Sequence, residues 1–198
     1  MSERRATYRR ETRETAIEAA WDLDGSGHAE VSTGIGMLDH LVEQLARHGI
    51  FDITLVAKGD LHVDPHHTVE DTAIALGRAF LGAIGEGAGI TRMGDALVPL
   101  DEALAQVAVD VSGRGYASLA VRWTGEQVGE LPCDLIEHLL QSLALEGKFN
   151  LNVRLLSGVN DHHKAEVIFK ALGRALSIAT RLEPRRAGQT PSTKGTLG

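Results

Sequence analysis

Histidine is the residue type whose number and spacing point to chemistry in this sequence. The chain has nine histidines in 198 residues, and four of them form two adjacent pairs. Residues 66–70 read HHTVE and residues 162–166 read HHKAE, so a glutamate lies four residues after the first histidine of each pair. A single histidine is usually a core or surface residue, but this repeated pattern of imidazole and carboxylate is typical of transition-metal ligands. We therefore expect metal sites built from these segments.

Helical spacing predicts how the side chains divide between ions. Residues i and i+4 of a helix share a face, so His66 and Glu70 can share an ion, whereas His67 lies about 100° around the axis and should face another. The second pair divides in the same way, and matched histidines upstream of each pair are further candidates. One consistent solution has two ligand sets, namely His40, His67, His162 and Glu166, and His66, Glu70, His138 and His163. The spacing leaves open whether one chain or neighbouring subunits supply each set.

Each set would contain three imidazoles and one carboxylate, with coordination positions left open. Open positions are typical of catalytic ions rather than structural ones. Mn, Fe, Co, Ni and Zn all accept these ligands, and the sequence does not choose among them. Asp39, Asp71 and Asp161 flank the ligands. They could accept imidazole N–H bonds, or they could equally cap helices and face solvent.

The candidate ligands lie in a duplicated chain. Residues 75–79 and 171–175 both read ALGRA, 96 positions apart, and the segments that begin at Phe51 and Phe149 match at an offset of 98. Internal similarity of this kind indicates two copies of one structural unit. We therefore divide the chain into a first half at 1–90, a second half at 91–182 and a C-terminal tail at 183–198. The tail is rich in Pro, Gly and Thr and has no apolar periodicity.

Apolar periodicity predicts matching elements in the two halves. Alternation predicts strands over 51–57 and 149–155, and helical spacing predicts helices around 38–45, 69–80, 136–143 and 165–176. Weaker alternation predicts further strands at 5–11, 16–23, 27–32, 103–111 and 116–123. Sheets with helices packed on one face make the expected fold class α+β.

The composition excludes several classes of function. Hydrophobic residues make up 43% and charged residues 24% of the chain, as in ordinary globular proteins, and the net charge of −7 disfavours nonspecific nucleic-acid binding. No apolar run is long enough for a membrane span, and the charged N-terminus lacks the apolar segment of a secretory signal. Cys133 is the only cysteine, which excludes an internal disulfide and a cysteine-based zinc site. We expect a cytoplasmic protein that binds neither nucleic acid nor membrane.

Several segments, which occur in the same order and cover nearly the whole chain, resemble the imidazoleglycerol-phosphate dehydratase family of histidine biosynthesis. These segments are RET at 13–15, GIGMLDH at 34–40, HHTVED at 66–71, RMGDA at 92–96, PLDEA at 99–103, DVSGR at 110–114, DHHKAE at 161–166 and PSTKG at 191–195. The chain departs from the family pattern at Leu41, Pro65 and Gly115, and none of these departures removes a candidate ligand.

The resemblance implies a fold of two similar halves, each with a four-stranded sheet and two helices packed on one face, of the ribosomal protein S5 domain 2-like type. It implies two Mn²⁺ ions per active site, at sites between the subunits of a homo-oligomer of 24 chains. The implied ligand assignment agrees with the division given above. The implied reaction removes water from D-erythro-imidazole glycerol phosphate and gives imidazole acetol phosphate.

The resemblance also assigns roles to single residues. It implies that His67 and His163 are catalytic and that Glu14 moves a proton at the substrate. The phosphorylated imidazole substrate would be bound by Glu14 together with a set of polar and basic residues, namely His48, Arg92, Arg114, Lys170, Ser192, Thr193 and Lys194. A lysine in an aperiodic tail makes sense if the tail closes over a bound phosphate, because phosphate needs cations or N–H donors.

Two ions suit this substrate because an imidazole ring has two nitrogens. A cation at each nitrogen would allow the ring to lose its N–H and be held as imidazolate. Electron density could then flow from the ring to expel the side-chain hydroxyl, and return when the adjacent C–H bond is lost. This is Lewis-acid chemistry without a redox step.

Two other classes of function fit the same residues. A dinuclear metallohydrolase would direct a bound water at an ester or amide with the same ligands. A metal-buffering or metal-stabilised assembly protein would instead have its open coordination positions filled by protein. The glycine-rich stretch GAIGEGAG at 82–89 lacks a Walker lysine, so we expect a linker between the halves there rather than a phosphate loop.

Overall fold

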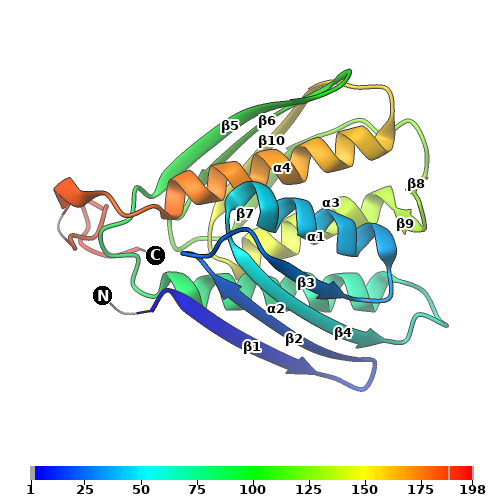
Figure 1. The fold of residues 1–198 in the computed structure, drawn as a ribbon, viewed down its shortest axis with the longest axis horizontal. Helices are drawn as coiled ribbons and strands as arrows, with labels where there is room; N and C mark the ends of the chain where they lie inside the picture. The colour runs from blue at the N-terminus through cyan, green and yellow to red at the C-terminus, as the bar shows by residue number, and fades with distance from the viewer. Residues whose placement is uncertain (1–2, 187, 198) are drawn as a thin grey trace.

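The computed structural model describes residues 3–186 and 188–197, and within them the same order of elements occurs twice, apart from two short additional strands in the second half (Figure 1). The first half contains β1 (Arg5–Glu11), β2 (Thr15–Asp22), β3 (Ala29–Ser32), α1 (Gly36–Gly49), β4 (Asp52–Gly59) and α2 (His66–Ile84). The second half contains β5 (Met93–Leu100), β6 (Ala103–Asp110), β7 (Tyr116–Ala120), β8 (Gln127–Val128), β9 (Leu131–Pro132), α3 (Cys133–Glu146), β10 (Asn150–Ser157) and α4 (Asp161–Thr180). A 3-10 turn, η1 (Pro184–Arg186), follows α4.

The two four-stranded sheets have the same topology. Their strand orders are β1-β2-β4-β3 and β5-β6-β10-β7, and β8 and β9 form a separate short ribbon. The last pair of each sheet, β3 with β4 and β7 with β10, is parallel, and the other pairs are antiparallel. The α+β class and the duplication expected from the sequence are confirmed.

The four long helices form a layer between the two sheets (Figure 1). α2 packs on β1 and β2 of its own sheet, and α4 packs on β5 and β6 of the other. The halves meet through their helices, because α1 packs against α4 and α2 packs against α3. Each of these two helix pairs therefore combines one helix from each half.

The repeated ALGRA segments lie where these helices cross. A Cβ atom at Gly173 in α4 would lie 2.5 Å from the carbonyl oxygen of Leu45 in α1. A Cβ atom at Gly77 in α2 would lie 2.8 Å from Cβ of Glu146 in α3. Real side chains do not approach so closely, so glycine at both positions is what allows the helices of the two halves to touch.

Aromatic side chains join the two halves into one core. Trp21 and Phe80 of the first half are fully buried, with their rings 5.1 Å apart between centroids. Phe80 in turn contacts Phe149 of the second half at 5.4 Å, edge to face. Packing of this kind holds side chains in fixed positions, so the helix layer can present ligands from both halves with a defined geometry.

The strands of the two large sheets agree with the sequence expectation except at β5, which the alternation did not predict, and the two-residue strands β8 and β9 were not predicted either. Gly94 and Pro99 interrupt its apolar pattern. β5 is an edge strand, where a proline costs no internal ladder bond. The glycine-rich stretch 82–89 ends α2 and leads toward β5, as expected of a linker. In the described part of the chain, no helix is long and apolar enough to cross a membrane.

Candidate metal centres

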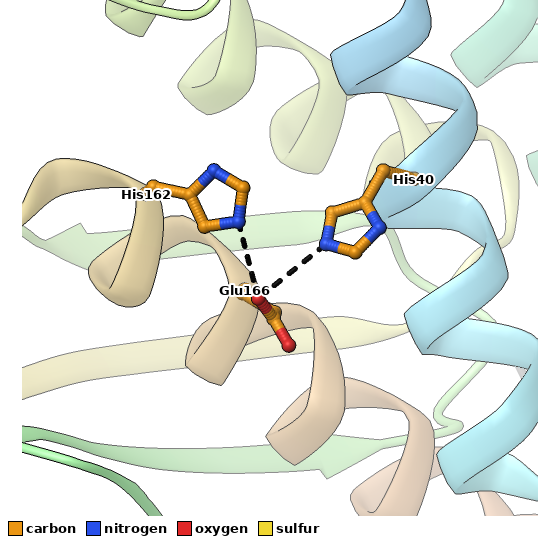
Figure 2. A group of neighbouring side chains, drawn as sticks. All are labelled: His40, His162 and Glu166. Carbon is orange, nitrogen blue, oxygen red and sulfur yellow. Dashed lines mark hydrogen bonds and ion pairs between the residues drawn. The ribbon is translucent and has the colours of Figure 1, made fainter.

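The first group of candidate ligands lies where α1 meets α4 (Figure 2). His40 projects from α1, and His162 and Glu166 project from the start of α4. Glu166 Oε2 is 3.4 Å from His40 Nε2 and 3.2 Å from His162 Nε2. One ligand atom of each residue lies within 4.8 Å of the other two. We call His40, His162 and Glu166 the first trio.

The matching residues of α2 and α3 form a second group. His66 and Glu70 lie one turn apart at the start of α2, and Glu70 Oε1 is 3.3 Å from Nε2 of His138 in α3. The rings of His66 and His138 are stacked 5.2 Å apart, close to the 5.4 Å between the rings of His40 and His162. We call His66, Glu70 and His138 the second trio.

Local hydrogen bonds fix the helix turns that carry the His–Glu pairs. Asn160 is the N-cap of α4, and its Oδ1 accepts the backbone N–H of His162 at 2.9 Å. Just before α2, Asp64 Oδ1 accepts the backbone N–H of His66 at 2.8 Å. The first backbone N–H groups of a helix have no partner within the helix, so these side chains stabilise the first turn. They thereby orient the ligands that begin there.

The trios fit a divalent transition-metal ion. Nε2 of His138 is buried and makes no hydrogen bond to any described residue, although Glu70 Oε1 lies 3.3 Å away at an unsuitable angle. A buried polar atom without a partner is costly, and an ion between these atoms would remove that cost. Two imidazole nitrogens and one carboxylate oxygen also form a donor set that such ions accept.

A lysine distinguishes the first trio from the second. Lys170 Nζ lies 2.6 Å from Glu166 Oε1, on the side of the carboxylate away from the histidines. Burial would raise the pKa of Glu166, but the hydrogen bonds from Lys170 and His40 outweigh it and lower that pKa. Burial, reinforced by the charge of Lys170, lowers the pKa of His48 on α1. The structure thus brings His48 and Lys170 to the first trio.

His67 and His163 do not join a trio of their own chain. His67 Nδ1 lies 3.0 Å from Asp60 Oδ2, and His163 Nδ1 lies 2.8 Å from Glu102 Oε2. These hydrogen bonds raise the pKa of both histidines. Backbone N–H bonds, first that of Asn160, and the bond from His163 lower the pKa of Glu102 to about 2. Each trio therefore contains three of the four expected ligands, and the fourth stays a prediction.

Asp60 and Glu102 contact two of the candidate ligands, and the residue spacing in the sequence did not point to them. The three aspartates considered instead bind other polar groups: Asp39 binds Thr33, Asp71 binds Arg10 and Asp161 binds Lys164. Within residues 3–186 and 188–197, none of these three hydrogen-bonds a histidine side chain. The structure therefore supports neither the imidazole contact nor simple exposure to solvent, because Asp71 is buried and Asp161 is paired with a buried lysine.

Of the residues that the resemblance places on the phosphate side of the substrate, Arg92, Arg114, Ser192 and Lys194 line one cavity of about 160 Å³, and Lys170 is the fifth. Its lining consists of Arg92, Ser112, Arg114, Ser192, Thr193, Lys194 and Thr196. Arg92 binds Asp110 at 2.7 Å and also donates to the carbonyl of Pro191 at 2.8 Å, which ties the tail to the rim of the cavity. Lys170 is not part of this lining.

Glu14 lies near His67. It is exposed in the turn between β1 and β2 and lines an open cavity of about 350 Å³ with Asp60 and His62. The hydrogen bond to Asp60 is the main cause of the raised pKa of His67, and the negative charge of Glu14 adds to it. A carboxylate at this place is available to accept or donate a proton next to a candidate ligand.

The fold and its two trios define a duplicated α+β protein with paired clusters of candidate metal ligands, and its known relatives share one description. A family profile described as imidazoleglycerol-phosphate dehydratase matches residues 33–176. The imidazoleglycerol-phosphate dehydratase of Dehalococcoides mccartyi is 53% identical over 197 residues, with 100% of this chain and 99% of the relative covered. That of Chloroflexus aggregans is 54% identical over 194 residues, with 98% and 95% covered.

Solved structures give the same result. The crystal structure of the Staphylococcus aureus imidazoleglycerol-phosphate dehydratase superposes with a TM-score of 0.82 at 30% identity, covering 90% of this chain and 99% of the other. The Pyrococcus furiosus enzyme in complex with (S)-C348 gives 0.82 at 34% identity, covering 96% and 99%. The chain belongs to the imidazoleglycerol-phosphate dehydratase family, and it is a hydro-lyase, a dehydratase of histidine biosynthesis.

Proposed function

We propose that the chain removes water from D-erythro-imidazole glycerol phosphate and gives imidazole acetol phosphate through two divalent cations per active site. The observation that carries the proposal is the pair of matched trios, each built across the two halves. A ring with two nitrogens matches two similar cation sites. Membership of the imidazoleglycerol-phosphate dehydratase family supports the identity of the substrate.

Each trio, completed by one more imidazole, would hold one cation, and the family resemblance favours Mn²⁺. When bound, the two cations would supply Lewis-acid charge that favours the imidazolate form of the substrate ring during loss of water. Glu70 and Glu166 contribute the negative charge of each ligand set. The histidines contribute neutral donors that leave coordination positions open.

His67 and His163 would complete trios that belong to neighbouring subunits. Each is bonded through Nδ1 to a carboxylate of its own chain and lies outside the trios of that chain. This supports a homo-oligomer with metal sites between subunits. The number of 24 subunits rests on the family resemblance.

Glu14 would move the carbon-bound proton or protonate the leaving hydroxyl. It is exposed beside His67, in the turn before β2, and general acid–base catalysis by a positioned carboxylate needs that proximity. His48 and Lys170 lie at the first trio, whose expected fourth ligand is His67, so they would bind the substrate near the same cation as Glu14.

The cavity lined by Arg92 and Arg114 would bind the substrate phosphate. Guanidinium and ammonium groups form charge-assisted hydrogen bonds with phosphate oxygens. Three polar tail residues, Ser192, Thr193 and Lys194, line the same cavity. The tail at 183–198 would therefore close the site over the two halves at 1–90 and 91–182.

Product analysis tests the proposal. Metal-loaded full-length protein is incubated with imidazole glycerol phosphate, and the product should be lighter by one water with no phosphate released. His67→Asn and His163→Asn should each lower turnover by orders of magnitude. Released phosphate would indicate a metallohydrolase instead, and near-normal turnover after either substitution would overturn the two-cation scheme.

A further inference from the structure

The two expected ligand sets contain six histidines, all at duplicated positions. Two of these six hydrogen-bond a carboxylate through Nδ1. His67 Nδ1 lies 3.0 Å from Asp60 Oδ2 and 3.3 Å from Oδ1, and His163 Nδ1 lies 2.8 Å from Glu102 Oε2. Among residues 3–186 and 188–197, no other duplicated histidine has a carboxylate at Nδ1. These two are also the histidines that lie outside the trios of their own chain.

The two carboxylates come from positions that the duplication does not relate. Glu102 immediately precedes β6, and its counterpart immediately before β2 is Glu14. Asp60 instead follows β4, and the residue in that place after β10 is Gly158. A contact inherited passively from the duplication would join equivalent residues. The same bond formed from two different elements indicates that the bond itself is needed.

The hydrogen bond decides which ring nitrogen can act as a ligand. An ionised carboxylate only accepts, so the proton of a neutral imidazole must lie on Nδ1 and the lone pair on Nε2. Metal-binding histidines commonly donate their other N–H to a carboxylate in this way. Asp101 Oδ2 is the carboxylate oxygen facing Nε2 of His163, and at 3.9 Å it is too far for a hydrogen bond.

Glu102 is fixed by bonds of its own. Its Oε1 accepts the backbone N–H groups of Val159 at 3.1 Å and Asn160 at 2.9 Å. These bonds leave Oε2 for His163. A carboxylate held on one oxygen by the loop before α4 can orient the imidazole that follows in the first turn of that helix.

We propose that Asp60 and Glu102 are positioning residues that hold His67 and His163 with the proton on Nδ1 and present Nε2 as the metal-binding atom. The proposal rests on the proposed function, in which these histidines complete the trios. It also explains why Glu102 hydrogen-bonds a histidine whereas its counterpart Glu14 does not have this role. Because Asp60 orients His67, Glu14 is left free for proton transfer at the substrate.

Manganese binding tests the proposal without an activity assay. Full-length protein is stripped of metal with a chelator and titrated with Mn²⁺ alone. Glu102→Gln keeps an oxygen for the backbone N–H groups but turns an N–H₂ group toward Nδ1, which favours the wrong tautomer. Glu102→Gln and Asp60→Ala should each weaken Mn²⁺ binding about 10- to 100-fold. Asp60→Asn, which can still accept the bond through Oδ1, should lose less.

A matched control removes another His–carboxylate pair. Glu30 Oε1 lies 3.2 Å from Nε2 of His28 at an exposed place on β3, so Glu30→Gln should leave Mn²⁺ affinity unchanged. Melting temperatures of the metal-free variants are compared with that of the parent, because the bonds from His67 and His163 form without metal and the loss of one can lower stability. If Asp60→Ala melts at a lower temperature than the parent, its weaker Mn²⁺ binding could come from lost stability. In that case the Mn²⁺ affinity of Asp60→Asn, compared with that of the parent, tests the positioning role of Asp60.

The variant His67→Asn distinguishes two possible failures: that of the positioning roles of Asp60 and Glu102, and that of the ligand sets in the proposed function. If His67→Asn leaves Mn²⁺ affinity unchanged, His67 is not a ligand and the proposed ligand set is wrong. If His67→Asn weakens binding but the Asp60 and Glu102 variants bind Mn²⁺ like the parent, the ligand set stands and the positioning roles are overturned.

Discussion

His40 Nε2 lies 3.4 Å from Glu166 Oε2, although the two residues are 126 positions apart and belong to different halves of the chain. The second trio repeats the relationship, with Glu70 in the first half and His138 in the second. Each proposed cation would therefore bridge the halves where their helices cross. This geometry couples metal binding to folding as well as to chemistry.

Metal removal should lower the stability of the fold. A ligand that binds only the folded state at about 100 times its Kd adds about 2.7 kcal/mol to the free energy of unfolding. We therefore expect chelator-treated protein to melt at a lower temperature than protein loaded with Mn²⁺. His40→Asn should reduce this difference, whereas His28→Asn, away from both trios, should preserve it. Identical melting curves with and without Mn²⁺ would contradict the bridging role.

Lys170→Met should strengthen metal binding at the first trio. Lys170 Nζ lies 2.6 Å from Glu166 Oε1 and neutralises part of the charge that an ion would use. The corresponding residue of α2 is Ile74, so the second trio should bind the cation more tightly than the first. Mn²⁺ titration of Lys170→Met should bring the two affinities closer, and Lys148→Met serves as the control. Weaker binding in Lys170→Met would show that the lysine supports the site instead.

Lys194→Met should raise KM more than it lowers kcat. Lys194 lines the cavity that also contains Arg92 and Arg114. A hydrogen bond to a charged group contributes about 1.5–3 kcal/mol, which corresponds to about 10- to 150-fold in KM. Arg185→Met is the control, because Arg185 is an exposed tail cation paired with Glu183. A chain that ends at Pro184 should show a KM raised at least as much, and an unchanged KM would argue against closure by the tail.

Gly173→Ala should destabilise the fold by about 1–3 kcal/mol through overpacking. The added methyl group would lie 2.5 Å from the Leu45 carbonyl oxygen, and the helices of the two halves would have to separate. Urea unfolding measures the loss. Because the first trio lies on the same two helices, Mn²⁺ affinity should fall as well. A variant with unchanged stability would show that the crossing tolerates a side chain.

Asp52→Asn should make the free energy of unfolding fall less steeply as the pH is lowered. Backbone N–H groups of His28 and Ser26 donate to Asp52 Oδ1 at 2.9 and 2.7 Å, and they lower the pKa of Asp52 below its ordinary 3.8. A carboxyl with a lowered folded-state pKa stabilises the fold fully above its ordinary pKa, and this contribution is lost as the pH falls through the lowered value. Urea unfolding at pH values from about 6 to about 2 measures the slope, and an equal slope in Asp52→Asn would contradict the assignment.

The pairing of each candidate histidine with its glutamate was predictable from the sequence, because residue type and helical spacing determine it locally. His66 and Glu70 must share a face wherever the helix lies, and the repeat relates them to His162 and Glu166. The assignment of His40 to the first trio depended on the repeat and on the resemblance. Its physical basis is the helix crossing at Gly173, which spacing alone does not reveal.

Asp60 and Glu102 were not predictable in the same way. One follows a strand and the other lies in a hairpin turn, and only the packing of those elements beside α2 and α4 brings them to the histidines. Asp39, Asp71 and Asp161 are nearer to the ligands in sequence, but the helix geometry turns them toward other partners. β5 was missed because Gly94 and Pro99 conceal its alternation.

Metal content per chain, measured together with turnover of imidazole glycerol phosphate, tests the central claim most directly. The two trios predict two equivalents of divalent metal per chain at full activity, with activity lost on chelation and restored on reloading. Full activity with one equivalent per chain, or with none, would contradict the account.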